Sequence, residues 1–190
     1  AWDFPLVLHA LSLTPFEPIQ SASLRDSSVK AAFLVAIASG RRCSEIHALS
    51  VDSTVFSNSG ATLYFSPGFL AKNEASSFSA SPIFLPYINK SSDRAQRLCC
   101  PVRALKWYID KTRTVRGSSK QLFITSTKPF RPAARSTVAG WLVEAITRAK
   151  ATVTNSSPNA HSIRAISSTW AFAHGISIGE ILNTVAWKTE

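Results

Sequence analysis

The sequence is short of cysteines and contains no long apolar run. Its three cysteines, Cys43, Cys99 and Cys100, are an odd number without regular spacing, which argues against a disulfide framework. An adjacent pair without further ligands is not a typical metal site, so we expect all three to be reduced, intracellular and structural. No apolar run reaches the length of a membrane-spanning helix, and the N-terminus lacks the basic start and cleavage pattern of a signal peptide.

Acidic residues are scarce in the second half of the chain. Residues 1–90 hold six basic and six acidic residues, whereas residues 91–190 hold fifteen basic and five acidic residues. The formal net charge of +10 therefore comes from the second half. A one-sided basic surface favours a polyanionic partner, above all nucleic acid. A basic globular protein without such a partner would have the same composition.

The length and composition indicate one globular domain. A chain of 190 residues, 45% of them hydrophobic, has the size and the apolar content of a single ordinary domain. The sequence contains no internal repeat and no low-complexity tract. Because the chain begins without Met and ends at "WKTE", we expect it to be a fragment of a longer protein.

The spacing of apolar residues predicts a mainly helical chain with one small sheet. We expect helices over residues 3–12, 24–40, 43–50, 101–116, 136–150, 155–175 and 177–187. Gly40 is placed to end the second of these, and Pro101 and Pro158 lie in the first turns of two others. Aromatic and branched residues predict strands over 61–66 and 81–88. The type of the apolar stretch 121–125 stays open.

The first candidate site lies in "SGRRCSEIHAL", residues 39–49. Arg42 and Glu45 are three residues apart, so on a helix the carboxylate would brace the guanidinium. A braced Arg has already lost its rotamer freedom and is suited to holding a phosphate. Taken alone, the same pair is more typical of an ordinary surface ion pair at a helix start.

Three further candidates lie later in the chain. Lys72 falls between the two predicted strands, where it could extend from a hairpin into a cleft, although it is also typical of a solvated turn. His161 and Arg164 are three residues apart in "AHSIRAISSTWA" and would share one helix face, which an apolar core helix does not require. Trp187 in "NTVAWKTE" offers one N–H donor, although a Trp usually belongs to the core.

In chain order these candidates are Arg, Lys, His-x-x-Arg and Trp, and in this order the sequence resembles the tyrosine recombinases of the phage-integrase type. The resemblance covers nearly the whole chain and concerns their catalytic domain. "ASGRRCSEIHAL" resembles the first-arginine motif Thr-Gly-x-Arg-x-x-Glu-x-x-x-Leu, with Ser39 in place of Thr and Arg41 at a variable position. "AHSIRA" resembles the His-x-x-Arg motif. "LVAIASGRRCSEIHALS", "CPVRALKWYIDKT" and "AWKTE" are most similar to recombinases of eukaryotic DIRS-like and Crypton-like mobile elements.

The resemblance implies a fold and a division of the chain. The fold is α+β and mainly α, a helical bundle with a small antiparallel β-sheet. Residues 1–23 would form an N-terminal helix and a connecting segment. Residues 24–190 would form the catalytic domain, truncated before the nucleophilic Tyr. Family members usually carry an N-terminal helical domain that closes a clamp around DNA, and we expect this chain to lack it, because only about two dozen residues precede the first helix of the catalytic domain.

The resemblance also implies a chemistry for each candidate, with Glu45 in a supporting role. A Tyr hydroxyl attacks a DNA phosphate and forms a 3′-phosphotyrosyl bond, so that rejoining needs no ATP. Arg42 and Arg164 would neutralise the non-bridging oxygens, and Trp187 would add a hydrogen bond there. His161 would bind the phosphate or take the Tyr proton, and Lys72 would protonate the leaving 5′ oxygen. No cofactor and no metal is expected.

One departure from the family pattern concerns the nucleophile. The resemblance places it nine or ten residues after Trp187, whereas the chain ends at Glu190. Tyr64, Tyr87 and Tyr108 fall in the predicted strands and a basic helix, so we interpret them as structural. We therefore expect this chain to bind double-stranded DNA but not to cleave it alone.

Binding to DNA would depend on phosphate contacts and on salt. Residues that could provide such contacts are basic and lie in the second half of the chain: Arg103, Lys106, Arg131, Arg135 and Arg148. The resemblance further implies self-association on DNA, as a tetramer of the full-length protein. It also implies an intracellular location, in the nucleus if the host is a eukaryote, and no contact with a membrane.

Three alternatives remain beside an active recombinase. The chain could be a domesticated or decayed DNA-binding module that kept the fold and lost catalysis. A type IB topoisomerase shares the chemistry, but the small size of the chain and the residue pattern of the motifs favour a recombinase. A generic basic protein would need four motif matches in the right order by accident.

Overall fold

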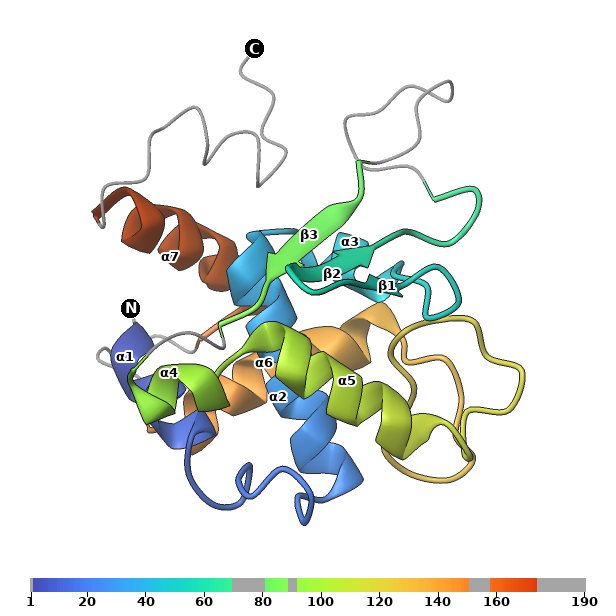
Figure 1. Ribbon diagram of the computed structural model, residues 1–190, viewed down its shortest axis with the longest axis horizontal. Coiled ribbons are helices and arrows are strands. Elements are labelled where there is room, and N and C mark those ends of the chain that lie inside the picture. Colours follow the sequence, from blue (N-terminus) through green and yellow to red (C-terminus); the bar gives the residue numbers. More distant parts are fainter. Residues whose placement is uncertain (1, 70–80, 89–91, 151–157, 174–190) are drawn as a thin grey trace.

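The computed structural model describes residues 2–69, 81–88, 92–150 and 158–173 (Figure 1). Its helices and strands, in chain order, are α1 (Phe4–Leu11), α2 (Leu24–Ser39), α3 (Cys43–His47), β1 (Val55–Phe56), β2 (Gly60–Leu63), β3 (Ile83–Pro86), α4 (Arg94–Leu98), α5 (Pro101–Thr112), α6 (Arg135–Arg148) and α7 (Ala160–Ala173). The helices surround one core and the strands form one small antiparallel sheet, which confirms the predicted fold class. In the described part of the chain, no helix is both long and apolar enough to cross a membrane.

Helix α2 is the central element of the molecule (Figure 1). It begins after Ser23, whose hydroxyl accepts a hydrogen bond from the backbone N–H of Asp26. Every residue from Ser27 to Ile37 is buried, so other elements cover this helix on all sides. It ends at Gly40, whose φ of 59° is the left-handed conformation that Gly adopts without strain. The arginines that follow Gly40 therefore start from a fixed point of the core.

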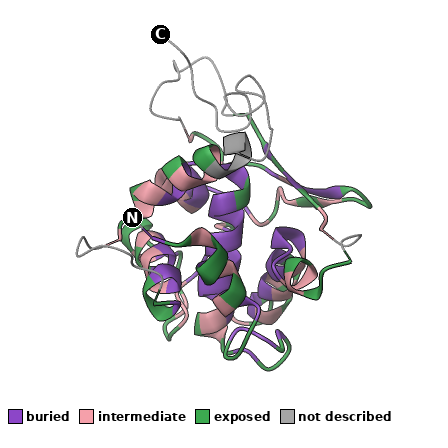
Figure 2. Ribbon diagram, turned by 90° about the vertical axis from the view of Figure 1, so that its left-hand side faces the viewer, coloured by how far each residue is buried: buried purple, intermediate pink, exposed green. Residues whose placement is uncertain are grey.

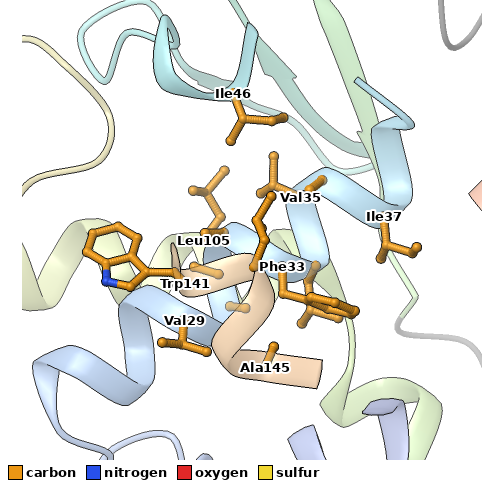
Figure 3. Packing of buried hydrophobic residues seen from close by; sticks show 14 of the residues in the cluster. Val29, Phe33, Val35, Ile37, Ile46, Leu105, Trp141 and Ala145 are labelled. Carbon is orange, nitrogen blue, oxygen red and sulfur yellow. The ribbon is translucent and has the colours of Figure 1, made fainter. Parts of the chain in front are cut away.

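Helices α5, α6 and α7 pack against α2 and share one hydrophobic core with it. Figure 3 shows Val29 and Phe33 of α2, Leu105 of α5 and Trp141 of α6 within this cluster. Figure 2 shows that the buried residues lie on the inward sides of the helices. Since burying one large apolar side chain contributes about 1.5–3 kcal/mol, this core is the main source of stability.

The three strands form an antiparallel sheet in the order β1-β2-β3. Ala61 pairs with Leu85, and both side chains are buried. A Cβ at Gly60 would lie 2.1 Å from the carbonyl oxygen of Leu85, so no other residue fits there without a shift of the backbone. Strand β3 contacts α2 and α5, and a bridge between Leu49 and Phe65 ties the sheet to the chain after α3.

The structure differs from the predicted elements at several ends. Strand β1 and helix α4 were not predicted because they are only two and five residues long. Helix α3 ends at His47 rather than at residue 50, because Leu49 and Ser50 form β-bridges. Helix α7 begins at Ala160, so Pro158 precedes the helix instead of lying in its first turn. The predicted helix over 177–187 lies outside the described residues.

Candidate active site

The turn between α2 and α3 holds two arginines and one carboxylate. The backbone N–H of Arg42 donates to Glu45 Oε2 at 2.9 Å, which fixes the first turn of α3. Arg41 Nη1 donates to Glu45 Oε1 at 2.9 Å, and both side chains are buried. Each carboxylate oxygen of Glu45 therefore has one donor from this turn. Helix α6 lies beside the turn, where Cys43 Sγ donates to the carbonyl oxygen of Arg135 at 3.5 Å.

The predicted bracing of Arg42 by Glu45 is therefore wrong in its details. Glu45 binds the backbone of Arg42 and the guanidinium of Arg41, since these are the donors that its two oxygens reach. The guanidinium of Arg42 is left half-buried at the surface of the turn. The sequence carried a signal for the observed pair, because Arg41 and Glu45 have the i,i+4 spacing that favours ion pairs.

Helix α7 is held in place by hydrogen bonds in its first turn, to Trp2 near the N-terminus and to the last turn of α2. The Asn159 side chain accepts from the backbone N–H of Ser162 at 2.9 Å and so caps the first turn. Ser162 Oγ accepts from the indole N–H of Trp2 at 2.9 Å. Ser167 Oγ donates to the carbonyl oxygen of Ile37, in the last turn of α2, at 2.6 Å. These contacts fix α7 beside the end of α2, where the arginine turn begins.

The two segments meet at a pocket of about 150 Å³ that Arg42, His161, Arg164 and Ala165 line. His161 and Arg164 come from one face of α7, which confirms the geometric part of the prediction. Arg42 comes from a turn more than a hundred residues earlier in the chain. The pocket has several times the volume of a water molecule in the liquid, about 30 Å³, and it therefore has room for a phosphate group.

The pocket carries an excess of positive charge. Arg164 is buried, and its Nη1 lies 4.0 Å from Glu45 Oε2. The pKa of Arg164 is lowered to about 10: burial is the largest cause, the positive charges of Arg42 and Arg41 also lower it, and Glu45 opposes the shift. Within the part of the chain that the structure describes, three guanidiniums thus lie around a single carboxylate. Because an anion in the pocket would relieve this repulsion, the site is suited to a phosphate.

Of the remaining residues considered for catalysis, the structure describes only the tyrosines. Lys72 and Trp187 lie outside the described residues. All three tyrosines are described, and none of them lines the pocket. Tyr108 is buried, and its hydroxyl accepts from the backbone N–H of Ile124 at 2.9 Å. Burial raises the pKa of Tyr108 to about 12, which suits a structural phenol better than a nucleophile.

The basic residues that we considered for DNA contacts fall into two groups. Arg103 binds Glu17 with both Nη atoms, and Arg148 pairs with Asp26 and Glu144, so these two already have acidic partners. The other three are exposed and form no ion pair with the described residues: Lys106, Arg131 and Arg135. Lys106 lies over the rings of Phe56 and Tyr87 at 5.0 Å from each centroid.

The described residues contain no group of three or more His, Cys, Asp or Glu side chains that could hold a metal ion. The three cysteines are free thiols, and Cys99 and Cys100 are buried. Burial raises the pKa of Cys99 to about 11, which is typical of an unreactive structural thiol.

Comparison with known proteins identifies the fold through solved structures rather than through the sequence. No protein-family model matches the sequence, and no curated protein matches it. The structure is similar to XerH site-specific recombinase bound to its difH substrate in a pre-cleavage complex, with a TM-score of 0.68 and 11% identity over 100% of this chain and 47% of that one. It is similar to XerA recombinase, with a TM-score of 0.58 and 14% identity over 87% of this chain and 54% of that one.

The catalytic core of lambda integrase is also similar, with a TM-score of 0.53 and 13% identity. The match covers 95% of this chain and 89% of that core, whereas the chain spans about half the length of the XerH and XerA chains. The similarity thus concerns the part of these enzymes that the catalytic core represents. The structural neighbours are tyrosine recombinases, and this chain has the fold of their catalytic domain.

Proposed function

We propose that this chain is the DNA-binding catalytic domain of a site-specific tyrosine recombinase, which breaks and rejoins DNA through a 3′-phosphotyrosyl intermediate. One observation carries the proposal: a fold shared with recombinases brings Arg42, His161 and Arg164 to one positively charged pocket. A shared fold alone does not define an activity. The convergence of these three side chains from two distant segments adds the chemistry that the activity requires.

The three pocket residues would have different roles at a DNA phosphate. Arg42 and Arg164 would each hold a non-bridging oxygen and neutralise the charge that develops in the transition state. His161 would bind the same phosphate or accept the proton of the attacking hydroxyl. Arg164 is held in place by burial and by Glu45, so little rotamer freedom is lost when it binds. Two guanidiniums supply charge that other phosphoryl-transfer enzymes take from metal ions.

Lys72 would protonate the leaving 5′ oxygen, and Trp187 would add a hydrogen bond to the phosphate. A Tyr after Glu190 would be the nucleophile, because the pocket is not lined by Tyr64, Tyr87 or Tyr108. We further propose that the full protein assembles as a tetramer on DNA. It would act inside the cell for a mobile element of the DIRS-like or Crypton-like kind, in the nucleus if the host is a eukaryote.

The test uses the full-length product of the parent gene and a pool of nicked duplexes of randomised sequence. A covalent protein–DNA adduct on a denaturing gel is the expected result. The adduct should fall by about 10²–10³-fold in Arg42→Ala and in Arg164→Ala, the usual cost of removing one donor that stabilises transition-state charge. Arg113→Ala, an exposed surface change, serves as the control and should leave the yield unaltered.

Two other results would change the proposal. Salt-sensitive DNA binding without any adduct would favour the alternative of an inactive DNA-binding module with the same fold. Absence of DNA binding in the full-length protein and in this chain would contradict both functions.

A further inference from the structure

Trp2 binds a side chain of helix α7 that lies 160 positions later in the chain: its indole N–H donates to Ser162 Oγ at 2.9 Å. Only 6% of Trp2 is exposed. Its ring meets those of Phe4 and Phe33 edge-on, with centroid distances of 6.2 and 6.0 Å. Because Phe33 belongs to α2, Trp2 connects the central helix of the core to the first turn of α7.

The hydroxyl of Ser162 takes part in two hydrogen bonds. It accepts from the indole of Trp2, and it donates to the carbonyl oxygen of Asn159 at 2.7 Å. The backbone N–H of Ser162 donates to the Asn159 side chain at 2.9 Å. Hydrogen bonds linked through one hydroxyl polarise and strengthen one another. The contact with Trp2 is therefore part of the same hydrogen-bonded group that begins α7.

The two neighbours of Ser162 point into different surroundings. His161 is exposed and lines the pocket, whereas Ile163 is 2% exposed and belongs to the core. A rotation of this turn would move His161 out of the pocket and Ile163 out of the core together. Arg42 comes from the turn after α2, so its separation from His161 depends on how the first turn of α7 is docked.

The segment that carries Trp2 holds α7 at this contact rather than along a packed face. A groove of about 490 Å³ lies between residues 2–5 on one side and Ala165, Ile166 and Thr169 of α7 on the other. Ser167 Oγ, which donates to the carbonyl oxygen of Ile37, fixes α7 to α2 further along the helix. The position of the first turn therefore depends strongly on the hydrogen bond from Trp2.

We propose that Trp2 is a positioning residue for the pocket: through Ser162 it fixes the first turn of α7 and so holds His161 where it and Arg42 can contact one phosphate. The inference rests on the proposed function, because it assumes that the pocket binds a phosphate of DNA. Trp2 does not line the pocket and acts only through α7. Without its hydrogen bond, fewer molecules hold the binding-competent arrangement, and the affinity falls by that fraction.

The test measures the affinity of this chain for inorganic phosphate, followed by the NMR shift of the His161 imidazole at constant pH and ionic strength. Trp2→Phe keeps an aromatic ring, removes the N–H donor and should weaken binding by about 5-fold, within the range of one hydrogen bond. The substitution alters no charge, so the net charge around the pocket stays the same. Trp141→Phe is the matched control, because this buried Trp has no hydrogen-bond partner for its N–H among the described residues. It should change the affinity by less than about 1.5-fold.

A double-mutant cycle isolates the hydrogen bond from the loss of ring area. Ser162→Ala removes the acceptor and should weaken phosphate binding about as much as Trp2→Phe, so it tests the same bond even if Trp2→Phe does not fold. In the Ser162→Ala background, Trp2→Phe should change the affinity by less than about 1.5-fold, and a further loss of about 5-fold would overturn the inference. Ser162→Thr keeps the hydroxyl and should retain most of the affinity. Ser168→Ala, whose hydroxyl donates within α7 to the carbonyl oxygen of Arg164, is the control for the serine change.

Urea denaturation and amide exchange separate positioning from a merely structural role. In Trp2→Phe, the amides in the first turn of α7 should exchange faster, by a larger factor than those of α2. A loss of stability with unchanged phosphate affinity in the folded variant would contradict the inference. The proposed function fails separately, namely if Arg42→Ala leaves phosphate binding intact. If Arg42→Ala abolishes binding while Trp2→Phe behaves like Trp141→Phe, only the inference about Trp2 is lost.

Discussion

The molecule contains two buried clusters in which cations meet one carboxylate, and they differ in how completely the carboxylate is used. Glu17 accepts hydrogen bonds from Lys30, from both Nη atoms of Arg103 and from the backbone N–H of Ile19. Lys30 also donates to the carbonyl oxygen of Leu11 at 2.8 Å. This cluster connects the segment after α1 to α2 and α5, and each of its cations is bound to the carboxylate directly.

Counted over the described residues, the cluster around Glu45 has one more cation and borders the pocket. Arg41 and the backbone of Arg42 take its oxygens, while Arg164 remains at 4.0 Å and faces the pocket. Among the described residues, three guanidiniums lie around one carboxylate in this cluster, whereas two cations bind the carboxylate of Glu17. The two clusters therefore differ in their place: the cluster around Glu17 joins three segments of the core, whereas the cluster around Glu45 borders the pocket.

The largest expected effect comes from a substitution that disrupts the cluster around Glu17. Glu17→Ala leaves Lys30 buried without its carboxylate, and the free energy of unfolding should fall by about 3–5 kcal/mol, measured by urea denaturation. Glu144→Ala removes a carboxylate from more exposed ion pairs and should cost no more than about 1 kcal/mol. Equal losses in the two variants would show that the cluster around Glu17 contributes no more to stability than the more exposed ion pairs of Glu144.

Two arginine variants should show that one cluster mainly affects stability and the other mainly affects DNA binding. Arg103→Ala should lower the free energy of unfolding by about 1.5–3 kcal/mol, because it removes hydrogen bonds to a charged group, and leave the affinity for duplex DNA within about 2-fold. Arg42→Ala should do the reverse, with a loss of affinity of about 10-fold and a stability change below about 1 kcal/mol. Fluorescence anisotropy and urea denaturation on both proteins give the comparison. A loss of affinity in Arg103→Ala as large as that in Arg42→Ala would contradict it.

The pKa of Arg164, in the cluster around Glu45, should respond to added anions. Because burial and then Arg42 lower the pKa of Arg164 to about 10, its charged form is disfavoured in the free protein and favoured by a bound anion. Inorganic phosphate should therefore raise this pKa, and phosphate affinity should fall as the pH rises through about 10. Carbon-13 NMR of the guanidinium measures both. Chloride at equal ionic strength is the control, and an equal shift with chloride would exclude a specific phosphate site.

The smallest effect concerns the helix caps. Asn159→Ala removes the cap of α7, and Ser23→Ala removes the cap of α2, each at a cost of about 1 kcal/mol in the free energy of unfolding. Only Asn159→Ala should also weaken DNA binding, because α7 carries His161 and Arg164. If both variants bind DNA equally well, the first turn of α7 does not control the pocket.

Local sequence patterns predicted most of the helices because their signals are short-range. Gly40 was expected to end α2, and it does so in the left-handed conformation. The three-residue spacing of His161 and Arg164 placed both on one face of α7, which the structure confirms. Elements such as β1 and α4 were missed because two to five residues carry too little periodicity to be recognised.

The identity of the partner of Glu45 could not be predicted in the same way. Arg41 and Arg42 are adjacent, and either spacing to Glu45 is compatible with an ion pair on a helix. The choice depends on Gly40, which turns the chain, and on the carbonyl of Ser81, which orients the guanidinium of Arg41 from forty residues away. Likewise, Arg103 and Arg135 are both basic residues near a helix start, and only packing against Glu17 distinguishes them.

The sequence by itself determined most of the described helices, the excess of basic charge in the second half and the residue types of the candidate site, because these follow from composition and short-range spacing. The tertiary structure decided which arginine side chain binds Glu45, which arginines line the pocket and which basic residues form ion pairs with acidic ones. Those outcomes depend on side chains that are distant in the chain and become neighbours only when α3 and α7 dock at the end of α2.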